Sequence, residues 1–408
     1  MTVKEIRAEF PILSSSVYNR PLVYLDNAAS SQRPLSVVRK LEELSLKENA
    51  NIHRAVHYLA AKATDEYEAA REAVRAALNA ESKEEIVFTS GTTAAINLVA
   101  YSFGEAFVGE GDEIIVSVAE HHSNIVPWQL LCERKKASLK VIEIDENGEL
   151  QAGTLEKLIS QRTKIVAISQ ISNVLGLINP VAEIIETAHS HGVPVLVDGA
   201  QGFVHLKTDV RALACDFYVF SGHKVFATTG TGVLYGKKEW LEKMPPFMGG
   251  GEMIGTVSFN GTTFAPLPYK FEAGTQNFNG IPTLVPALEL REKCLNDNDL
   301  LKNEEEITAY VLRALTSNPS ITLYGVPRRT EDKIPLFSFS VKGVHHEDLA
   351  LIMDKMGIAL RSGQMCAEPL MDHFGVSGML RASFAPYNTM DEAKYFIQCL
   401  DKAIGMLQ

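Results

Sequence analysis

Lys224 and Asp198 are the two residues whose types and settings point most directly to chemistry. Lys224 follows an apolar stretch that reads as a buried strand, and Asp198, 26 residues earlier, ends the apolar run 193–197. A lysine amine can condense with an aldehyde, and an ionised carboxylate can keep a pyridine nitrogen protonated. Alone, each residue is more often a solvated lysine or a turn aspartate. Together they predict a pyridoxal phosphate site, provided that both side chains point into one pocket.

A phosphate group would need an anion site, and the segment around Gly91 has the pattern of one. A strand expected at 85–89 leads through this glycine into a helix that begins near residue 94. Free main-chain N–H groups and the positive end of the helix dipole attract anions at such a junction. Thr92 and Thr93 add hydroxyl donors there. An ordinary N-cap threonine is the alternative when this pattern stands alone.

Other polar residues that follow strands could complete a cofactor site. Ser221 and His223 flank the lysine with donors suited to phosphate oxygens, and Gln201 could donate to the phenolic oxygen of the ring. His121, on a loop after the strand expected at 113–118, could stack on the ring and transfer protons. Adjacent histidines can also mark a metal site, but no further ligand lies nearby at the usual spacing. We therefore expect no metal.

Nine short motifs occur in order along nearly the whole chain, and together they resemble class V aminotransferases. Within that group the chain is similar to group II, SufS-like cysteine desulfurases and selenocysteine lyases. The resemblance implies an α/β protein of fold-type I, with a mostly parallel, seven-stranded-type sheet in a large pyridoxal phosphate domain and a smaller C-terminal α+β domain. The motifs lie at 24–29, 51–54, 91–93, 120–122, 172–176, 198–201, 221–224, 271–275 and 361–367.

The resemblance assigns the chemistry to three residues. Lys224 would hold pyridoxal phosphate and carry the α proton of the substrate, and His121 would act as an acid. Cys366 would take the sulfur of L-cysteine as a persulfide, leaving L-alanine and supplying sulfur for iron–sulfur cluster assembly. Positive charge nearby would favour its thiolate.

The resemblance also implies residues that bind the cofactor and the substrate. Thr275 would reach the phosphate of the neighbouring subunit's cofactor, so the site would be shared across a homodimer. The implied cofactor-binding residues are Thr92, Thr93, His121, Asp198, Gln201, Ser221, His223, Lys224 and Thr275. The implied substrate-binding residues are Ala28, His53, Asn173, Arg361 and Arg381.

The chain departs from the group II pattern next to the nucleophile. Two histidines commonly precede the cysteine, whereas this chain has Gln364 and Met365. The loop is also short, so we expect sulfur transfer to need an acceptor protein, SufE-like or zinc-dependent SufU-like, that reaches into the pocket. A glycine-rich stretch at 248–259 lacks the lysine of a phosphate loop and predicts a protruding hairpin.

Two other classes of function, one enzymatic and one not, are also compatible with the sequence. The same site could serve a selenocysteine lyase, a kynureninase-like hydrolase or a transaminase, or the fold could be a scaffold without chemistry. Cys366 favours the desulfurase, because its flanks are polar and contain glycine. The other four cysteines read as small buried hydrophobes: Cys132, Cys215, Cys294 and Cys399.

Composition agrees with a globular enzyme. The 408 residues are 46% hydrophobic and carry a net charge of −11, which argues against nucleic acid or an anionic membrane as partner. Five cysteines, an odd number, indicate a reducing compartment. No signal-peptide core begins the chain and no run reaches membrane-span length, so we expect a cytoplasmic protein.

Short apolar strands alternate with helical stretches from about Tyr24 to Pro282, the pattern of a parallel sheet covered by helices. We predict an N-terminal segment at 1–20 that packs on the small domain, a large domain at 21–285 and the small domain at 286–408. In one helix the apolar residues fall on one face, and Arg71 is expected off that face. These apolar residues are Tyr67, Ala70, Val74, Ala77 and Leu78.

Overall fold

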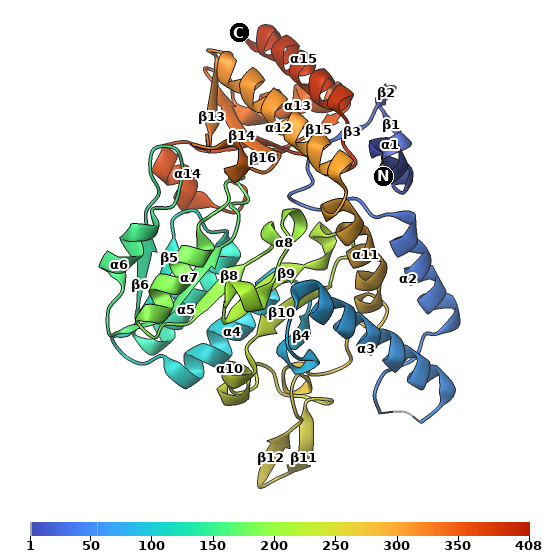
Figure 1. Ribbon diagram of the computed structural model, residues 1–408, viewed down its shortest axis with the longest axis vertical. Helices are drawn as coiled ribbons and strands as arrows, with labels where there is room; N and C mark the ends of the chain where they lie inside the picture. Colours follow the sequence, from blue (N-terminus) through green and yellow to red (C-terminus); the bar gives the residue numbers. More distant parts are fainter. Residues whose placement is uncertain (1, 55) are drawn as a thin grey trace.

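A seven-stranded sheet forms the centre of the larger part of the molecule (Figure 1). The computed structural model describes residues 2–54 and 56–408. β10 runs antiparallel to both of its neighbours and the other adjacent pairs are parallel, so the predicted mostly parallel sheet is confirmed. In spatial order the strands are β4 (Ile86–Thr89), β10 (Gly232–Gly236), β9 (Phe217–Ser221), β8 (Val195–Asp198), β7 (Thr163–Ser169), β5 (Glu113–Ser117) and β6 (Ser138–Ile142).

Both faces of this sheet are buried, which explains why its strands are almost continuously apolar. Alternate residues of β9 enter two separate hydrophobic clusters, Tyr218 and Phe220 on one face and Phe217 and Val219 on the other. The first face is covered by α3 (Tyr58–Leu78), α7 (Val181–Ser190) and α11 (Leu284–Leu295). The second is covered by α4 (Thr92–Phe107) and α5 (Val126–Lys135). With both faces of the central strands covered, ligands can approach these strands at their ends.

A four-stranded antiparallel sheet forms the smaller part (Figure 1). Its order is β13 (Ile321–Tyr324), β14 (Leu336–Val341), β17 (Met379–Ser383) and β16 (Arg361–Gly363). Three helices pack into one hydrophobic cluster with it: α12 (Asn298–Ser317), α13 (His346–Lys355) and α15 (Met390–Leu407). Near the N-terminus, β3 (Val23–Tyr24) pairs in parallel with β15 (Ile358–Ala359). The domain boundaries at residues 20 and 285 stay predictions.

A hairpin extends from the end of the molecule opposite the four-stranded sheet (Figure 1). It consists of β11 (Ile254–Ser258) and β12 (Gly261–Phe264), so the hairpin predicted from the glycine-rich stretch is confirmed. In the described part of the chain, no helix combines the length and the apolar character that crossing a membrane requires. The remaining elements are α1 (Val3–Ala8), β1 (Ser16–Val17), β2 (Arg20–Pro21), α2 (Leu35–Lys47), α6 (Leu155–Leu158), α8 (Gly202–His205), α9 (Val210–Leu213), α10 (Lys238–Lys243) and α14 (Glu368–Phe374).

Arg71 was expected off the apolar face of α3, and this expectation is wrong. Its side chain is fully buried and forms a bidentate ion pair with Glu272, at 2.7 and 3.0 Å. It also donates to the main-chain oxygen of Ile86 at 2.8 Å, and the N–H of Phe88 donates to Glu272. A buried charge is tolerated when it is paired and hydrogen-bonded. The pair ties α3 to β4 and to the segment just before Thr275.

We expect Glu272→Ala to lower the free energy of unfolding by roughly 3–5 kcal/mol, because it leaves the Arg71 charge buried without its partner. Glu72→Ala is the matched control, since it breaks an exposed pair with Arg75 on the same helix and should cost less than about 1 kcal/mol. Urea unfolding of both variants measures the difference. Equal losses would contradict a special role for the buried pair.

Candidate active site

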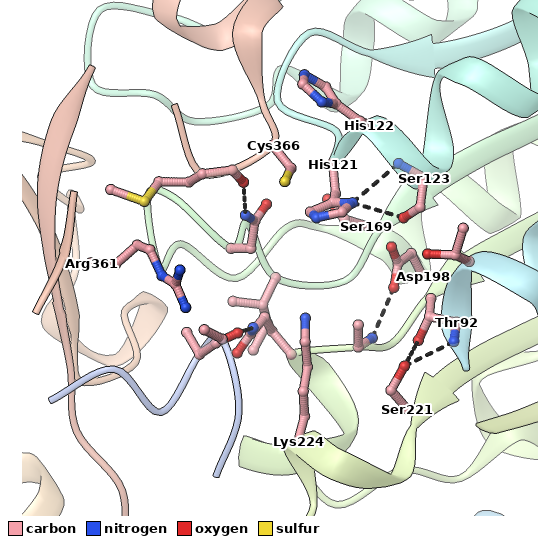
Figure 2. A pocket seen from close by; sticks show the side chains of 18 of the residues that line it. Thr92, His121, His122, Ser123, Ser169, Asp198, Ser221, Lys224, Arg361 and Cys366 are labelled. Carbon is pink, nitrogen blue, oxygen red and sulfur yellow. Dashed lines mark hydrogen bonds between the residues drawn. The ribbon is translucent and has the colours of Figure 1, made fainter. Parts of the chain in front are cut away.

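The predicted site residues meet where several strands of the large sheet end. Asp198 and Ser221 are the last residues of β8 and β9, which are neighbours, and Thr92 is the first residue of α4. A cavity of about 540 Å³ opens at this edge. In open α/β sheets, ligands bind outside the carboxyl ends of the strands. Figure 2 shows Lys224 rising into this pocket from below, with Asp198 to one side and Cys366 above.

All but two of the predicted site residues line this cavity. They come from distant parts of the chain and from both sheets, so the fold is needed to bring them together. The residues inside are Ala28, Thr92, Thr93, His121, Asn173, Asp198, Gln201, Ser221, His223, Lys224, Arg361, Cys366 and Arg381. His53 and Thr275 lie outside it.

Lys224 and Asp198 form the electrostatic centre of the pocket. Burial lowers the pKa of Lys224 to about 8, an effect that Asp198 opposes and Arg381 reinforces. Among the described residues, none accepts a hydrogen bond from the Lys224 amine. Burial raises the pKa of Asp198. Two interactions lower it: the hydrogen bond from the Ala200 N–H to Oδ1, at 2.9 Å, and the charge of Lys224. The Lys224 amine and the Asp198 carboxylate thus face the same space without forming an ion pair with any described residue.

A cradle of donors lies at the start of α4. The Thr92 N–H donates to the Ser221 hydroxyl at 2.8 Å, and the two hydroxyls are also 2.8 Å apart. Gly91 has φ 155°, and a Cβ on Gly232 would lie 2.3 Å from the Gly91 main chain. Only glycine fits at this crossing. The close approach holds the helix N-terminus, which attracts anions, against the start of β10, whose Gly232 pairs with Ser221 at the end of β9.

His121 is held as a neutral imidazole of one tautomer. The Ser123 N–H donates to His121 Nδ1 at 3.1 Å, so the ring proton lies on Nε2. Burial lowers the pKa of His121 to about 4, and the positive charges of Lys224 and Arg381 contribute. The ring therefore offers a flat face and an Nε2–H donor at neutral pH.

Two arginines meet one aspartate at the side of the pocket formed by the small sheet. Arg361 and Arg381 are opposite each other on β16 and β17, and both pair with Asp26, at 2.7 and 3.4 Å. Arg381 also donates to the Asn173 main-chain oxygen at 2.8 Å. Its buried Nε has no hydrogen-bond partner within residues 2–54 and 56–408. An unpaired guanidinium donor in a pocket suits a carboxylate ligand.

Cys366 is the one exposed thiol among the five cysteines of the described chain, and it lies on the wall of the same cavity. The other four are buried, as predicted, and burial raises the pKa of Cys132, Cys215 and Cys294. Met365 and Cys366 have φ of 55° and 56°, a left-handed conformation that costs roughly 1–2 kcal/mol per residue. Surrounding contacts must hold such a turn in place.

The two residues that depart from the group II pattern take part in this turn. Met365 is buried in the main hydrophobic cluster, and its main-chain oxygen accepts from Asn173 Nδ2 at 2.9 Å. Gln364 Nε2 donates to Glu368 Oε1 at 2.9 Å. Both replacements therefore anchor the turn at its base.

Thr275 and His53 are not brought to Lys224 within one chain. Thr275 lines a separate cavity of about 210 Å³ together with Met248. His53 Nε2 lies 3.3 Å from a Glu68 carboxylate oxygen and lines a third cavity. Neither residue lines the cavity that contains Lys224.

Sequence reasoning missed several residues of the site. Asp26 lies within the motif at 24–29, but nothing in the sequence indicates that its carboxylate pairs with two arginines. Ser123 orients His121, and Ser169 lines the cavity. Glu120 is fully buried behind them, where burial raises its pKa to about 7. The sequence does not reveal these residues, because their interaction partners are either far away in the chain or brought close by local turns.

The residues present fit pyridoxal phosphate. The free Lys224 amine suits its aldehyde, the Asp198 carboxylate suits a protonated ring nitrogen, and the donors around Thr92 suit its phosphate. The opposing pyridinium would supply the positive charge that burial of Asp198 requires. In the described part of the chain, no group of histidine, cysteine and carboxylate side chains could hold a metal ion.

Comparison with known proteins agrees with this geometry. Residues 23–396 match the family model for class-V aminotransferases. A probable cysteine desulfurase of Halalkalibacterium halodurans is 46% identical over 98% of both chains, and a cysteine desulfurase of Escherichia coli O127:H6 is 46% identical over 100% of this chain and 99% of its own.

Two solved structures have the same fold over the full length of this chain. The cysteine desulfurase CsdA of Escherichia coli, in its S-sulfonic acid form, has a TM-score of 0.91 and 40% identity, and each chain is fully covered. The apo cysteine desulfurase of Thermococcus onnurineus NA1 has a TM-score of 0.93 and 35% identity, with 99% of its own chain covered. The chain therefore belongs to the class-V aminotransferase family of pyridoxal-phosphate-dependent enzymes, in which the relatives named here are cysteine desulfurases.

Proposed function

We propose that this protein is a cysteine desulfurase, which converts L-cysteine to L-alanine and takes the sulfur onto Cys366 as a persulfide. The observation that carries the proposal is the shared pocket. An exposed thiol lies on the wall of the cavity that holds Lys224 and Asp198. The match to cysteine desulfurases over the full chain supports it. A transaminase would have no use for this thiol.

The arginine side of the pocket would bind the substrate carboxylate. Asp26 neutralises one of the two arginine charges, so one positive charge remains, which suits a single carboxylate. The unpaired Nε of Arg381 would donate to it. This placement leaves the amino group of the substrate facing Lys224 and its side chain facing Cys366.

When bound, pyridoxal phosphate supplies an aldehyde for the amino group and a ring that withdraws electrons from the bonds around Cα. Lys224 would hold the cofactor and then remove the proton from Cα, because its lowered pKa makes a free amine accessible near neutral pH. Asp198 would hold the proton on the ring nitrogen. Neutral His121 would cover one ring face, with its Nε2–H available to donate a proton.

Cys366 would then carry out the transfer itself. Its sulfur attacks the substrate sulfur, a sulfur–sulfur bond forms and the Cβ–S bond breaks. The electron pair of that bond stays with the carbon fragment, which gains a proton at Cβ and leaves as L-alanine. No external oxidant is needed, because one thiol becomes a persulfide while the C–S bond is replaced by C–H.

The complete site would belong to a homodimer. Thr275 lies outside the pocket of its own chain, and the protruding hairpin exposes Val257, Phe259 and Phe264. Exposed apolar side chains gathered on a projecting element mark an interaction surface. In the proposed dimer this hairpin covers the neighbouring active site, and Thr275 donates to the neighbouring phosphate.

The persulfide would pass to a SufE-like or SufU-like acceptor protein for iron–sulfur cluster assembly. The turn that carries Cys366 is anchored at Met365 and Gln364 and has little room to swing, so the acceptor must approach the pocket. Within the described residues all five cysteines are free thiols, which supports a reducing compartment such as the cytoplasm.

We expect Cys366→Ala to abolish alanine formation from L-cysteine while the absorbance of bound cofactor stays unchanged, because only the sulfur acceptor is lost. Cys399→Ala, which removes a buried thiol of the small domain, is the control and should retain activity. Assays with L-cysteine and L-selenocysteine measure both outcomes. Undiminished activity of Cys366→Ala on L-cysteine would contradict the proposal and favour a lyase that needs no persulfide.

Mixed dimers test the shared site. Lys224→Ala and Thr275→Asp disable every site of their own homodimers, but a mixed dimer would contain one site with both native residues. When equal amounts of the two variants pair at random, half of the dimers are mixed and half of the sites in those dimers are intact. The mixture should therefore recover about a quarter of the wild-type activity. The control pairs Lys224→Ala with Cys366→Ala, whose residues line one pocket of the same chain, and should recover none. Equal recovery in both mixtures would rule out the arrangement.

A further inference from the structure

The turn that presents Cys366, residues 363–368, needs contacts from outside itself. Its two left-handed residues, Met365 and Cys366, are not glycines. Within the turn one main-chain hydrogen bond, from the Ala367 N–H to the Gln364 oxygen at 3.0 Å, closes the chain. A left-handed pair of this kind persists only when the surrounding structure over-determines it. The residues that supply these contacts therefore control where the thiol points.

His122 bonds to this turn at two residues, Cys366 and Glu368. Its main-chain N–H donates to the Cys366 oxygen at 2.7 Å. Its ring Nε2 accepts from the Glu368 N–H at 2.9 Å. Figure 2 shows the His122 ring above Cys366, away from Lys224 and Asp198. The same residue thus bonds to the nucleophile and to the first residue of α14.

The ring contact fixes the state of His122. Because Nε2 accepts a main-chain N–H, this nitrogen carries no proton, and the ring proton lies on Nδ1. This is the opposite tautomer from His121, which accepts through Nδ1. The two adjacent histidines therefore have different tasks, and only His121 offers an Nε2–H donor to the pocket.

We propose that His122 is a positioning residue for the persulfide-forming thiol: it holds the 363–368 turn so that Cys366 faces the substrate sulfur. This inference rests on the proposed desulfurase function. His122 lines the same cavity, but within the described residues its ring bonds to the Glu368 N–H and to neither Arg381 nor Lys224. Its loss should slow sulfur transfer without weakening substrate binding.

The test compares His122→Met with His122→Gln in the cofactor-loaded protein. Both side chains are unbranched and similar in length, but only glutamine has an oxygen near the position of Nε2 that can accept the Glu368 N–H. We expect His122→Met to lower kcat for alanine formation by roughly tenfold to a hundredfold, as misplacement of a reacting group does, with KM within about twofold of the wild type. His122→Gln should recover most of the lost kcat.

Hydrogen exchange of the main-chain amides at 364–370 provides a readout that is independent of activity. It should be faster in His122→Met and close to wild type in His122→Gln. His191→Met is the control, because that exposed ring bonds to Ser190 and Thr187 at the end of its own helix, far along the chain from the 363–368 turn. Equal losses of kcat in the two His122 variants, or a rise in KM that matches the fall in kcat, would overturn the proposal. If the wild type forms no alanine, the proposed function fails, and the exchange comparison alone decides whether His122 holds the turn.

Discussion

Burial of the Lys224 amine is the constraint on which the rest of the site depends. A lysine without water around it loses its proton more readily, and burial lowers its pKa to about 8. The sheet makes this burial possible, because β8 and β9 are parallel neighbours that end at the same edge and place Asp198 beside the segment that carries Lys224. Two clusters of apolar side chains hold those strands from both faces. The reactive amine is therefore a consequence of how the core is packed.

The second sheet carries the arginines that we propose for carboxylate binding, and the turn after it carries the proposed nucleophile, Cys366. β16 and β17 lie next to each other, so Arg361 and Arg381 share Asp26, and the turn after β16 brings Cys366 over the pocket. Asn173 links the two parts, because its oxygen accepts from Arg381 and its amide donates to Met365. One residue of the large part of the molecule thus contacts both the arginine side of the pocket and the turn that carries Cys366.

Much of this arrangement could be predicted from the sequence, because parallel strands leave motifs at their carboxyl ends. Asp198 follows such a run, and the glycine turn before Thr92 marks a helix N-terminus whatever its tertiary setting. Contacts between residues far apart in the chain could not be predicted in this way. Arg71 looks like a surface arginine until Glu272, about 200 residues later, is placed against it. The two left-handed residues of the 363–368 turn likewise have no sequence signature, because neither is glycine or asparagine.

The claim that Cys366 takes the sulfur is tested most directly by the mass of its peptide after the cofactor-loaded protein is exposed briefly to L-cysteine. Alanine is assayed in the same sample. The account predicts a gain of one sulfur atom on Cys366, matched by released alanine, while the peptide that contains Cys399 is unchanged. Alanine release with unmodified Cys366, or with sulfur on another cysteine, would contradict it.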